Sequence, residues 1–165
     1  MDQHLVSVTD LKLASAQVDE LGQLYSWFSN EPEISQWGGP GFEYPMSPEA
    51  FAAAVKVSEL ASFWLTDGDQ NVLGFGQFYV RLGRHHLGRL VINPAYRSNG
   101  LGKLLVQKLI EQAHQQQQAS GESLFVLRHN VAAIKCYQSL GFDFADYPEQ
   151  IPGNLANCDY MIRPE

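Results

Sequence analysis

The chain has 165 residues, 45% of them apolar, which is enough for one domain with a substantial core and too few for two. Its formal net charge of −7 argues against a nucleic-acid-binding protein, because affinity for phosphate backbones requires Lys and Arg clustered over an extended face. No window approaches the roughly 20 apolar residues of a membrane span, and residues 1–15 lack the basic start and apolar stretch of a secretory signal. We therefore expect a single cytoplasmic domain over residues 1–165, a monomer or homodimer, with neither nucleic acid nor membrane as a partner.

The first third of the chain predicts one strand and two helices. Apolar positions alternate over residues 8–13 and recur at helical spacing over residues 18–30. Residues 37–45 hold three glycines and two prolines, so we expect a loop there. A second helix is predicted over residues 48–58, with Ser47 as its N-cap and a proline at its first position.

The rest of the chain alternates strands and helices. Its apolar patterns and turn residues predict strands over 62–66, 72–80, 85–92, 123–127, 142–144 and 157–162, and helices over 100–118 and 130–140. This order alone indicates an α/β or α+β sheet protein. The two cysteines, Cys136 and Cys158, fall inside a helix and a strand, which indicates buried thiols; we expect no disulfide framework and no bound metal.

Positive charge is concentrated in one stretch. Residues 1–80 carry two bases against eleven acids, whereas residues 81–110 carry six bases and no acid. A basic island in an acidic protein favours a compact polyanionic ligand, although solvated strand and helix faces would give the same count.

The sequence Arg-Ser-Asn-Gly-Leu-Gly, residues 97–102, lies in this island between a predicted strand and a predicted helix. Gly100 and Gly102 allow close approach of a ligand to the backbone, and a helix start directs unpaired amides and partial positive charge outward. A nucleotide P-loop is excluded because Lys103 is followed by Leu104 rather than Ser or Thr. The loop therefore predicts a diphosphate-binding helix start.

A second pattern lies further along the chain. Asn130 and Tyr137 are seven residues apart, so both lie on one side of the predicted helix. Taken alone, they are more typical of an ordinary N-cap and an aromatic residue of the core.

Taken together, the two patterns resemble the acetyl-CoA site of the GNAT superfamily of N-acyltransferases. Residues 97–102 match Gln/Arg-x-x-Gly-x-Gly/Ala, and residues 130–142 match Asn-x-x-Ala-Ile-x-x-Tyr-x-x-x-Gly-Phe. The resemblance implies an α+β domain whose mixed, mostly antiparallel sheet has a central splay and is flanked by four helices. It also implies acetyl-CoA as the donor and coenzyme A as a product.

The resemblance assigns roles to particular residues. Asn130 would bond the pantetheine arm, the backbone amide near Val91 would stabilise the oxyanion, and the Tyr137 hydroxyl would protonate the leaving thiolate. The cofactor would be held mainly by Leu90, Val91, Ile92, Arg97, Ser98, Asn99, Gly100, Leu101, Gly102 and Lys103.

The resemblance does not by itself identify the general base. An alkyl amine is mostly protonated at neutral pH, so a group must take a proton from it. His86 is the first candidate because it shares a strand face with Leu90 and Ile92, although it would fit equally well as a packed core histidine. His129 is a lesser candidate. Relatives that acetylate ribosomal protein N-termini place a Glu base where this chain has Phe125.

The acceptor site is expected between the first two helices and their connecting loop. Aromatic residues and carboxylates gather there and suit a cationic amine, although they would also fit a capped core and a solvated surface: Trp27, Phe28, Trp37, Phe42, Tyr44, Glu31, Glu33 and Glu43. The sequence thus predicts an acetyl-CoA-dependent N-acetyltransferase acting on a small-molecule or peptide amine. The alternatives are a non-catalytic acyl-CoA-binding or sensing module and a transferase that uses a longer acyl-CoA.

Overall fold

The computed structural model describes residues 10–39, 41–97, 100–149 and 157–164. These residues form one seven-stranded sheet with the order β1-β2-β3-β4-β5-β7-β6. Its strands are β1 (Lys12–Ser15), β2 (Ala61–Thr66), β3 (Val72–Arg81), β4 (Arg84–Ile92), β5 (Gly121–Leu127), β6 (Asp143–Ala145) and β7 (Cys158–Pro164). Neighbours pair antiparallel except for β4 and β5, which are parallel, so the predicted mixed and mostly antiparallel sheet is confirmed.

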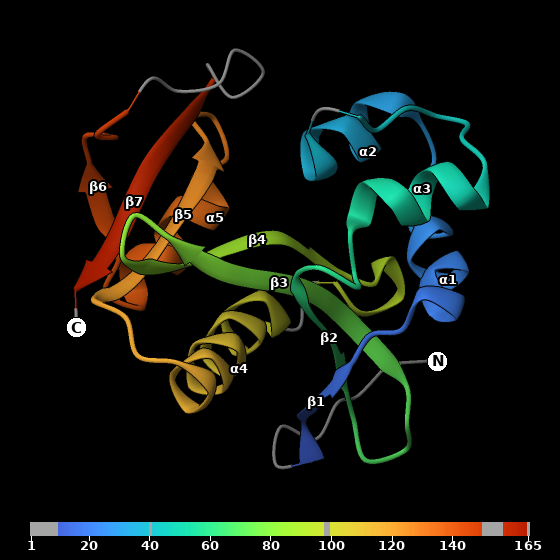
Figure 1. The fold of residues 1–165 in the computed structure, drawn as a ribbon, viewed down its shortest axis with the longest axis horizontal. Coiled ribbons are helices and arrows are strands. Elements are labelled where there is room, and N and C mark those ends of the chain that lie inside the picture. The colour runs from blue at the N-terminus through green and yellow to red at the C-terminus, as the bar shows by residue number, and fades with distance from the viewer. Residues whose placement is uncertain (1–9, 40, 98–99, 150–156, 165) are drawn as a thin grey trace.

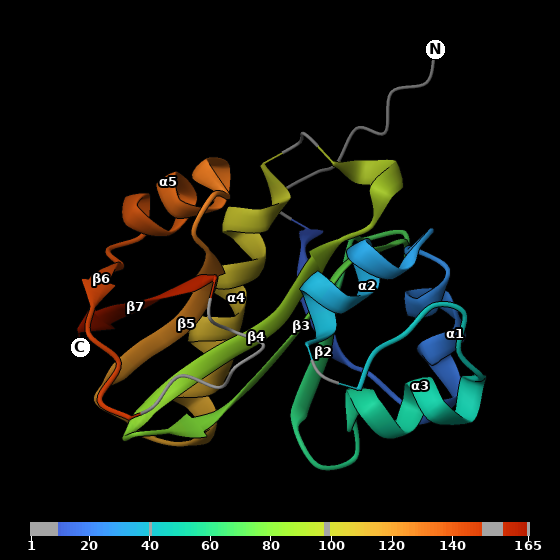
Figure 2. The same cartoon turned by 90° about the horizontal axis from the view of Figure 1, so that it is seen from above.

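The helices cover both faces of this sheet. They are η2 (Val18–Glu20), α1 (Leu21–Tyr25), α2 (Glu31–Gly38), α3 (Pro48–Val55), η3 (Pro94–Tyr96), α4 (Leu101–Gln116) and α5 (Val131–Ser139). Figure 2 shows α1, α2 and α3 together on one side of β3 and β4, with α4 on the other side. Among the described residues, no helix combines the length and apolar character needed to cross a bilayer.

The prediction of four helices is wrong, because the described residues form five α-helices. The run predicted as one helix over 18–30 ends as α1 at Tyr25, and α2 starts after Asn30, whose side chain accepts a hydrogen bond from the Glu33 amide at 3.0 Å. This cap, together with Pro32 in the first turn, starts a new helix. The last turn of α2 occupies positions predicted as loop. The first strand also lies later than predicted, and residues 8 and 9 are outside the described residues.

Two apolar clusters fill the space on the two faces of the sheet. One lies under α4, whose residues Leu101, Leu105 and Leu109 are almost fully buried against the sheet. The other is largely aromatic and lies under α1 to α3, where Phe51 and Phe75 are completely packed. The two clusters therefore lie on opposite faces of β3 and β4, which form the centre of the sheet.

The sheet opens at its centre. Within the described residues, β4 and β5 pair at two positions, His85 with Glu122 and His86 with Ser123. Beyond His86, β4 remains paired with β3 while β5 continues alongside β7 (Figure 1). A bulge in β4 opposite Phe75 to Gln77 bends the strand at this point, and Arg89 there has a left-handed φ of 50°. The predicted central splay is thereby confirmed.

Candidate active site

The loop before α4 brings a helix start to the open side of the sheet. Asn93 ties the loop to β3, because its Nδ2 donates to the Val72 carbonyl at 2.8 Å and its Oδ1 accepts from the Ala95 amide at 3.0 Å. Gly100 is the N-cap of α4, with a left-handed φ of 72° and no side-chain capping bond. The first amides of α4 are therefore not satisfied by a cap and can serve an anion. Ser98 and Asn99 lie outside the described residues.

Two adjacent cavities, which share several lining residues, lie beside this helix start. The first, of about 480 Å³, lies between β4, the first turn of α4 and α5. The second, of about 470 Å³, lies between β4 and β5 and shares Leu90, Val91, Arg97 and Tyr137 with the first. Between them they bring together all the described residues to which the sequence assigned the cofactor: Leu90, Val91, Ile92, Arg97, Gly100, Leu101, Gly102, Lys103 and Asn130.

Asn130 occupies the N-cap of α5. Its Oδ1 accepts a hydrogen bond from the Ala133 amide at 3.2 Å, which is the ordinary capping role. The residue is exposed and lines the second cavity. The capping bond fixes the side chain, and its predicted bond to a pantetheine amide stays a prediction.

Tyr137 lies two turns after Asn130 and lines both cavities. Its ring packs edge-on against Phe142, with 6.0 Å between ring centroids. Burial, with a smaller contribution from Cys136, raises the pKa of the Tyr137 hydroxyl to about 12. The hydroxyl therefore remains protonated at neutral pH and can act as a proton donor.

His86 lines neither of these two cavities but does line a third, which is described below. Its side chain is buried, with 4% exposed, and packs between the rings of Tyr79 and Phe125. Its Nδ1 lies 2.8 Å from Ser123 Oγ, at the last point where β4 and β5 pair. Burial, and then the charge of Arg81, lower the pKa of His86 to about 4. His86 is thus a neutral, weakly basic core side chain, and its catalytic role stays a prediction.

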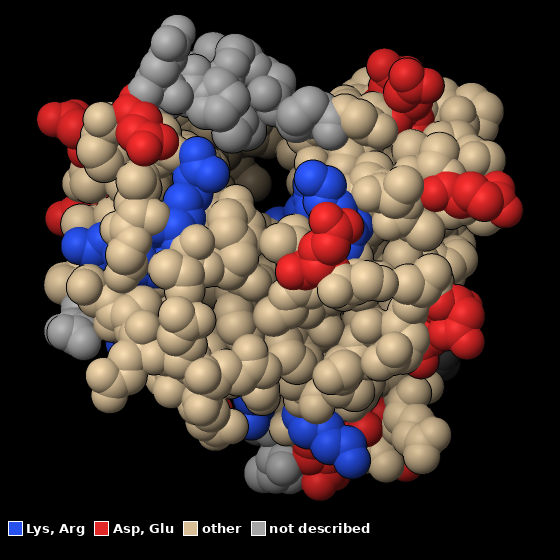
Figure 3. Space-filling view, in the orientation of Figure 1, with Lys and Arg blue, Asp and Glu red and all other residues tan. Residues whose placement is uncertain are grey.

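A third cavity, of about 470 Å³, continues from the second between α2, the end of α3 and the centre of the sheet. The two share Trp37, Gly88, Arg89 and Phe125. In Figure 3 this side of the molecule is hollowed between its two halves. Lys and Arg side chains lie on both sides of the hollow, with an acidic side chain next to those on the right.

The residues predicted to line the acceptor site divide into two groups. Phe28, Glu33 and Trp37 line the second cavity, and Trp37 also lines the third. The others do not line these cavities: Trp27, Glu31, Phe42, Glu43 and Tyr44. Trp27 and Phe42 are buried in the aromatic cluster, so they cap the core.

Sequence reasoning missed two of the residues that line the third cavity, Arg81 and Arg89. Both belong to the basic island, but the sequence interpretation assigned that charge to the diphosphate. Of the two cysteines, Cys158 is buried as predicted and lines the third cavity, whereas Cys136 is half-buried and lines the first.

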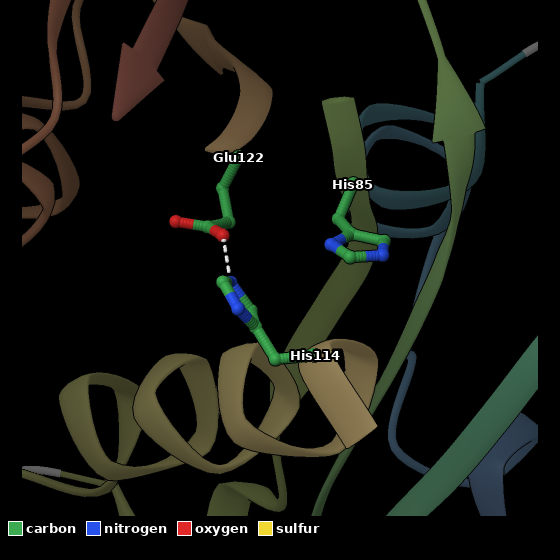
Figure 4. A group of neighbouring side chains, drawn as sticks. All are labelled: His85, His114 and Glu122. Atoms are coloured by element: carbon green, nitrogen blue, oxygen red, sulfur yellow. Dashed lines mark hydrogen bonds and ion pairs between the residues drawn. The ribbon is translucent and has the colours of Figure 1, made fainter. Parts of the chain in front are cut away.

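A cluster of polar side chains, which includes His85, His114 and Glu122, lies at the end of the splay where β4 and β5 still pair (Figure 4). Glu122 accepts from Arg163 Nη1 at 2.8 Å and lies 2.5 Å from Nε2 of His114 in the last turn of α4. His85 is 1% exposed, and neither of its ring nitrogens has a hydrogen-bond partner among the described residues. Burial, and then the neighbouring His114, lower the pKa of His85, whereas Glu122 and the Gln117 backbone oppose this shift.

The donor atoms of His85, His114 and Glu122 lie within 4.8 Å of one another, and two imidazoles with a carboxylate are a donor set that zinc accepts. The bonds that exist in the structure are nevertheless those of an ion-pair network, which ties α4 to β5 and β7. This network holds the closed end of the splay, opposite to the end of α4 that starts at Gly100.

A sheet opened between two parallel strands, with a helix start beside the opening, is the fold of several N-acetyltransferases of known structure. The ribosomal-protein-S18-alanine N-acetyltransferase of Escherichia coli aligns with a TM-score of 0.64 and 24% identity over 93% of each chain. The Vibrio cholerae spermidine N-acetyltransferase, solved with CoA and spermine, aligns with a TM-score of 0.73 and 16% identity over 94% of this chain and 96% of its own. AAC(6')-Ib, solved with ribostamycin and coenzyme A, aligns with a TM-score of 0.72 and 19% identity over 94% and 93%.

These likenesses establish the fold. The sequence model of the acetyltransferase (GNAT) family matches residues 21–142, which include the loop before α4, both strands of the splay and α5. The chain belongs to this family.

Proposed function

We propose that this acetyltransferase moves the acetyl group of acetyl-CoA to a primary amine of a small molecule or peptide, by direct attack of the amine on the thioester. One observation carries the proposal. The first cavity is lined both by the helix start at Gly100 and by Tyr137, and the second, which is also lined by Tyr137, lies in the gap between β4 and β5. The proposed anion site and the proposed proton donor thus line the same cavity.

The cofactor half of the site follows from charge and backbone geometry. The amides that follow Gly100, together with Arg97 and Lys103, bind the diphosphate. The backbone of β4 beyond His86 no longer pairs with β5, so its free polar groups can pair with the amides of pantetheine. Asn130 bonds the same arm from the opposite side of the gap.

The chemical step forms a C–N bond and breaks a C–S bond. The amine nitrogen attacks the thioester carbonyl carbon, and we assign a backbone amide of β4 near Val91 to stabilise the negative oxygen that develops. The carbonyl then re-forms, the sulfur leaves as a thiolate and Tyr137 donates a proton to it. The amine loses its proton to a water or to His86; the low basicity of His86 favours the water.

The test is release of free coenzyme A thiol from acetyl-CoA with and without a panel of primary amines. Release that depends on an amine, with the acetylated product identified by mass, supports the transferase. Tight binding of acetyl-CoA with no amine-dependent thiol release would instead support the acyl-CoA sensing module. Stronger thermal stabilisation by succinyl-CoA than by acetyl-CoA would indicate a longer acyl donor.

A further inference from the structure

The third cavity is positively charged in a protein that is acidic overall. Lys56, Arg81 and Arg89 line it, and no described Asp or Glu does, although the whole chain has a net charge of −7. Low-dielectric walls concentrate the field of such charges within a cavity. The space beside the proposed thioester site therefore repels cations and attracts anions.

Arg89 is the central residue of this cavity. Its Nη1 donates to Gln77 Oε1 at 3.0 Å, its Nε donates to the Gly38 carbonyl at 3.3 Å, and its guanidinium lies 5.2 Å from the centre of the Phe42 ring. All these partners are uncharged. Among the described residues no carboxylate pairs with Arg89 and no group accepts from its Nη2.

The bonds of Arg89 fix its position without neutralising its charge. Gln77 is itself held, because its Nε2 donates to the Val55 carbonyl and to Ser62 Oγ, both at 2.8 Å. A half-buried guanidinium without a counter-ion is unfavourable, and a bound anion that accepts from it would recover that free energy. Burial also lowers the pKa of Arg89, as expected for a charge that lacks its partner.

Two further cations border the same space. Arg81 donates through Nε and Nη2 to the Tyr147 hydroxyl, which leaves its Nη1 without a partner among the described residues. Lys56 is exposed at the end of α3. Within the described chain neither makes an ion pair at salt-bridge distance, although Arg81 feels the negative charge of Glu149 from farther away.

We propose that the acceptor is an amine that also carries a carboxylate, and that Arg89, with Arg81 beside it, binds this carboxylate in the third cavity. The inference rests on the proposed function and names its substrate class. The second and third cavities meet at Gly88, Arg89 and Phe125, so a small molecule whose carboxylate sits on Arg89 extends its amine toward Tyr137. Glu33 lines only the second cavity, on the side from which the amine approaches.

The same charges disfavour polyamines. A polyamine carries several positive charges, and in this cavity each one would meet Arg or Lys with no carboxylate to offset the repulsion. The spermidine N-acetyltransferase of Vibrio cholerae shares the fold, but likeness of fold does not fix the acceptor.

Matched pairs of amines test this inference. Thiol release is measured with alanine and alaninamide, with glycine and glycinamide, and with spermidine, all at saturating acetyl-CoA. We expect kcat/KM to be at least about tenfold higher for the member of each pair that carries the carboxylate, which is the range of a hydrogen bond to a charged group. Equal use of both members, or a preference for spermidine, would overturn the inference and leave the proposed transferase intact.

Variants that remove single positive charges test which residues cause the preference for a carboxylate. Arg89→Gln should bring the carboxylate-to-amide ratio close to one, whereas Lys12→Gln, which removes an exposed positive charge on β1, should keep the wild-type ratio. Because Arg89 also bonds α2 and α3, Arg81→Gln and Lys56→Gln provide variants with fewer structural contacts, and each should lower the ratio partly. A ratio unchanged in all three cavity variants would contradict the assignment. No release with any amine would overturn the proposed function and this inference together.

Discussion

Burial sets the protonation state of the two side chains that the sequence selected for catalysis. Burial raises the pKa of Tyr137 and lowers the pKa of His86, so that at neutral pH Tyr137 is a neutral phenol and His86 a neutral imidazole. The neutral phenol is the form that a proton donor needs. The buried imidazole, in contrast, takes up a proton only in acid, which makes it a poor partner for an ammonium group at neutral pH.

Replacing Tyr137 by Phe tests the proton donor. The phenyl ring keeps the packing against Phe142 and removes only the hydroxyl. We expect kcat to fall by roughly 100-fold, within the range of general acid catalysis, with little change in the Kd of acetyl-CoA. Steady-state kinetics and calorimetry measure the two quantities, and an unchanged kcat would remove Tyr137 from the chemical step.

His86 makes the stability of the protein depend on pH. Its pKa is about 4 in the folded chain against 6.5 in the unfolded one, so the unfolded chain binds more protons between these values. Stability is intact above pH 6.5 and is lost as the pH falls toward 4, by about 2 kcal/mol between pH 7 and pH 5. Urea unfolding at the two pH values measures this loss.

The matched variant for this prediction is His86→Gln. It lacks the titrating ring, so its free energy of unfolding should depend less on pH even though its stability at pH 7 is lower. His85, whose pKa burial also lowers, retains its own share of the acid sensitivity. A pH dependence as steep as that of the wild type would show that His86 titrates normally in the folded chain.

At the scale of elements, the start of α4 is the feature that the sequence predicted best. Gly100, the Ser47 cap of α3 and the capped start of α5 are each determined by a few neighbouring residues, and all three form where they were predicted. The break after α1 was missed because the apolar spacing continues across it, while the cap at Asn30 forms locally.

The third cavity could not be predicted from local patterns. Arg89 reaches Gly38 and Val55 because a bulge in β4 turns its backbone to a left-handed φ of 50°. The alternation of residues along a strand does not reveal that bulge, because the bulge depends on how β4 pairs with β3. Nor does it show that β4 lies close in space to the ends of α2 and α3. The sequence therefore identified the basic island, but not that Arg97 and Lys103 line the first cavity while Arg81 and Arg89 line the third.

Two glycine variants test the helix start. Gly100→Ala places a Cβ in open space but on a left-handed φ of 72°, so it should lower the free energy of unfolding by about 1 kcal/mol and weaken CoA binding. Gly102→Ala also meets open space, without a left-handed φ, and should leave stability equal or slightly higher, since Ala favours helix. Thermal unfolding and CoA titration of both variants measure these differences. Equal stability and equal CoA affinity of the two variants would show that the left-handed backbone at Gly100 is not required for either property.

At the scale of the whole molecule, the splay separates a closed end from an open one. The network of Glu122, His114 and Arg163 holds the closed end, and the cavities occupy the open end. At the open end β4 and β5 do not pair with each other. A ligand that binds between them should therefore stabilise the entire sheet.

Thermal unfolding with acetyl-CoA measures this stabilisation. A ligand at 100 times its Kd adds about 2.7 kcal/mol, which for a protein of this size raises Tm by roughly 5–10 °C. Adenosine alone, which lacks both diphosphate and pantetheine, serves as the control and should leave Tm almost unchanged. An equal rise with adenosine would show that the site recognises the base rather than the arm that fills the splay.

Calorimetric titration of coenzyme A and of pantetheine into the purified protein tests the central claim, that the backbone amides after Gly100 bind the diphosphate. We predict heat of binding to one site per chain for coenzyme A, and binding of pantetheine, which lacks the diphosphate, weaker by at least about 100-fold. No heat with coenzyme A, or equal affinity for the two compounds, would contradict the claim.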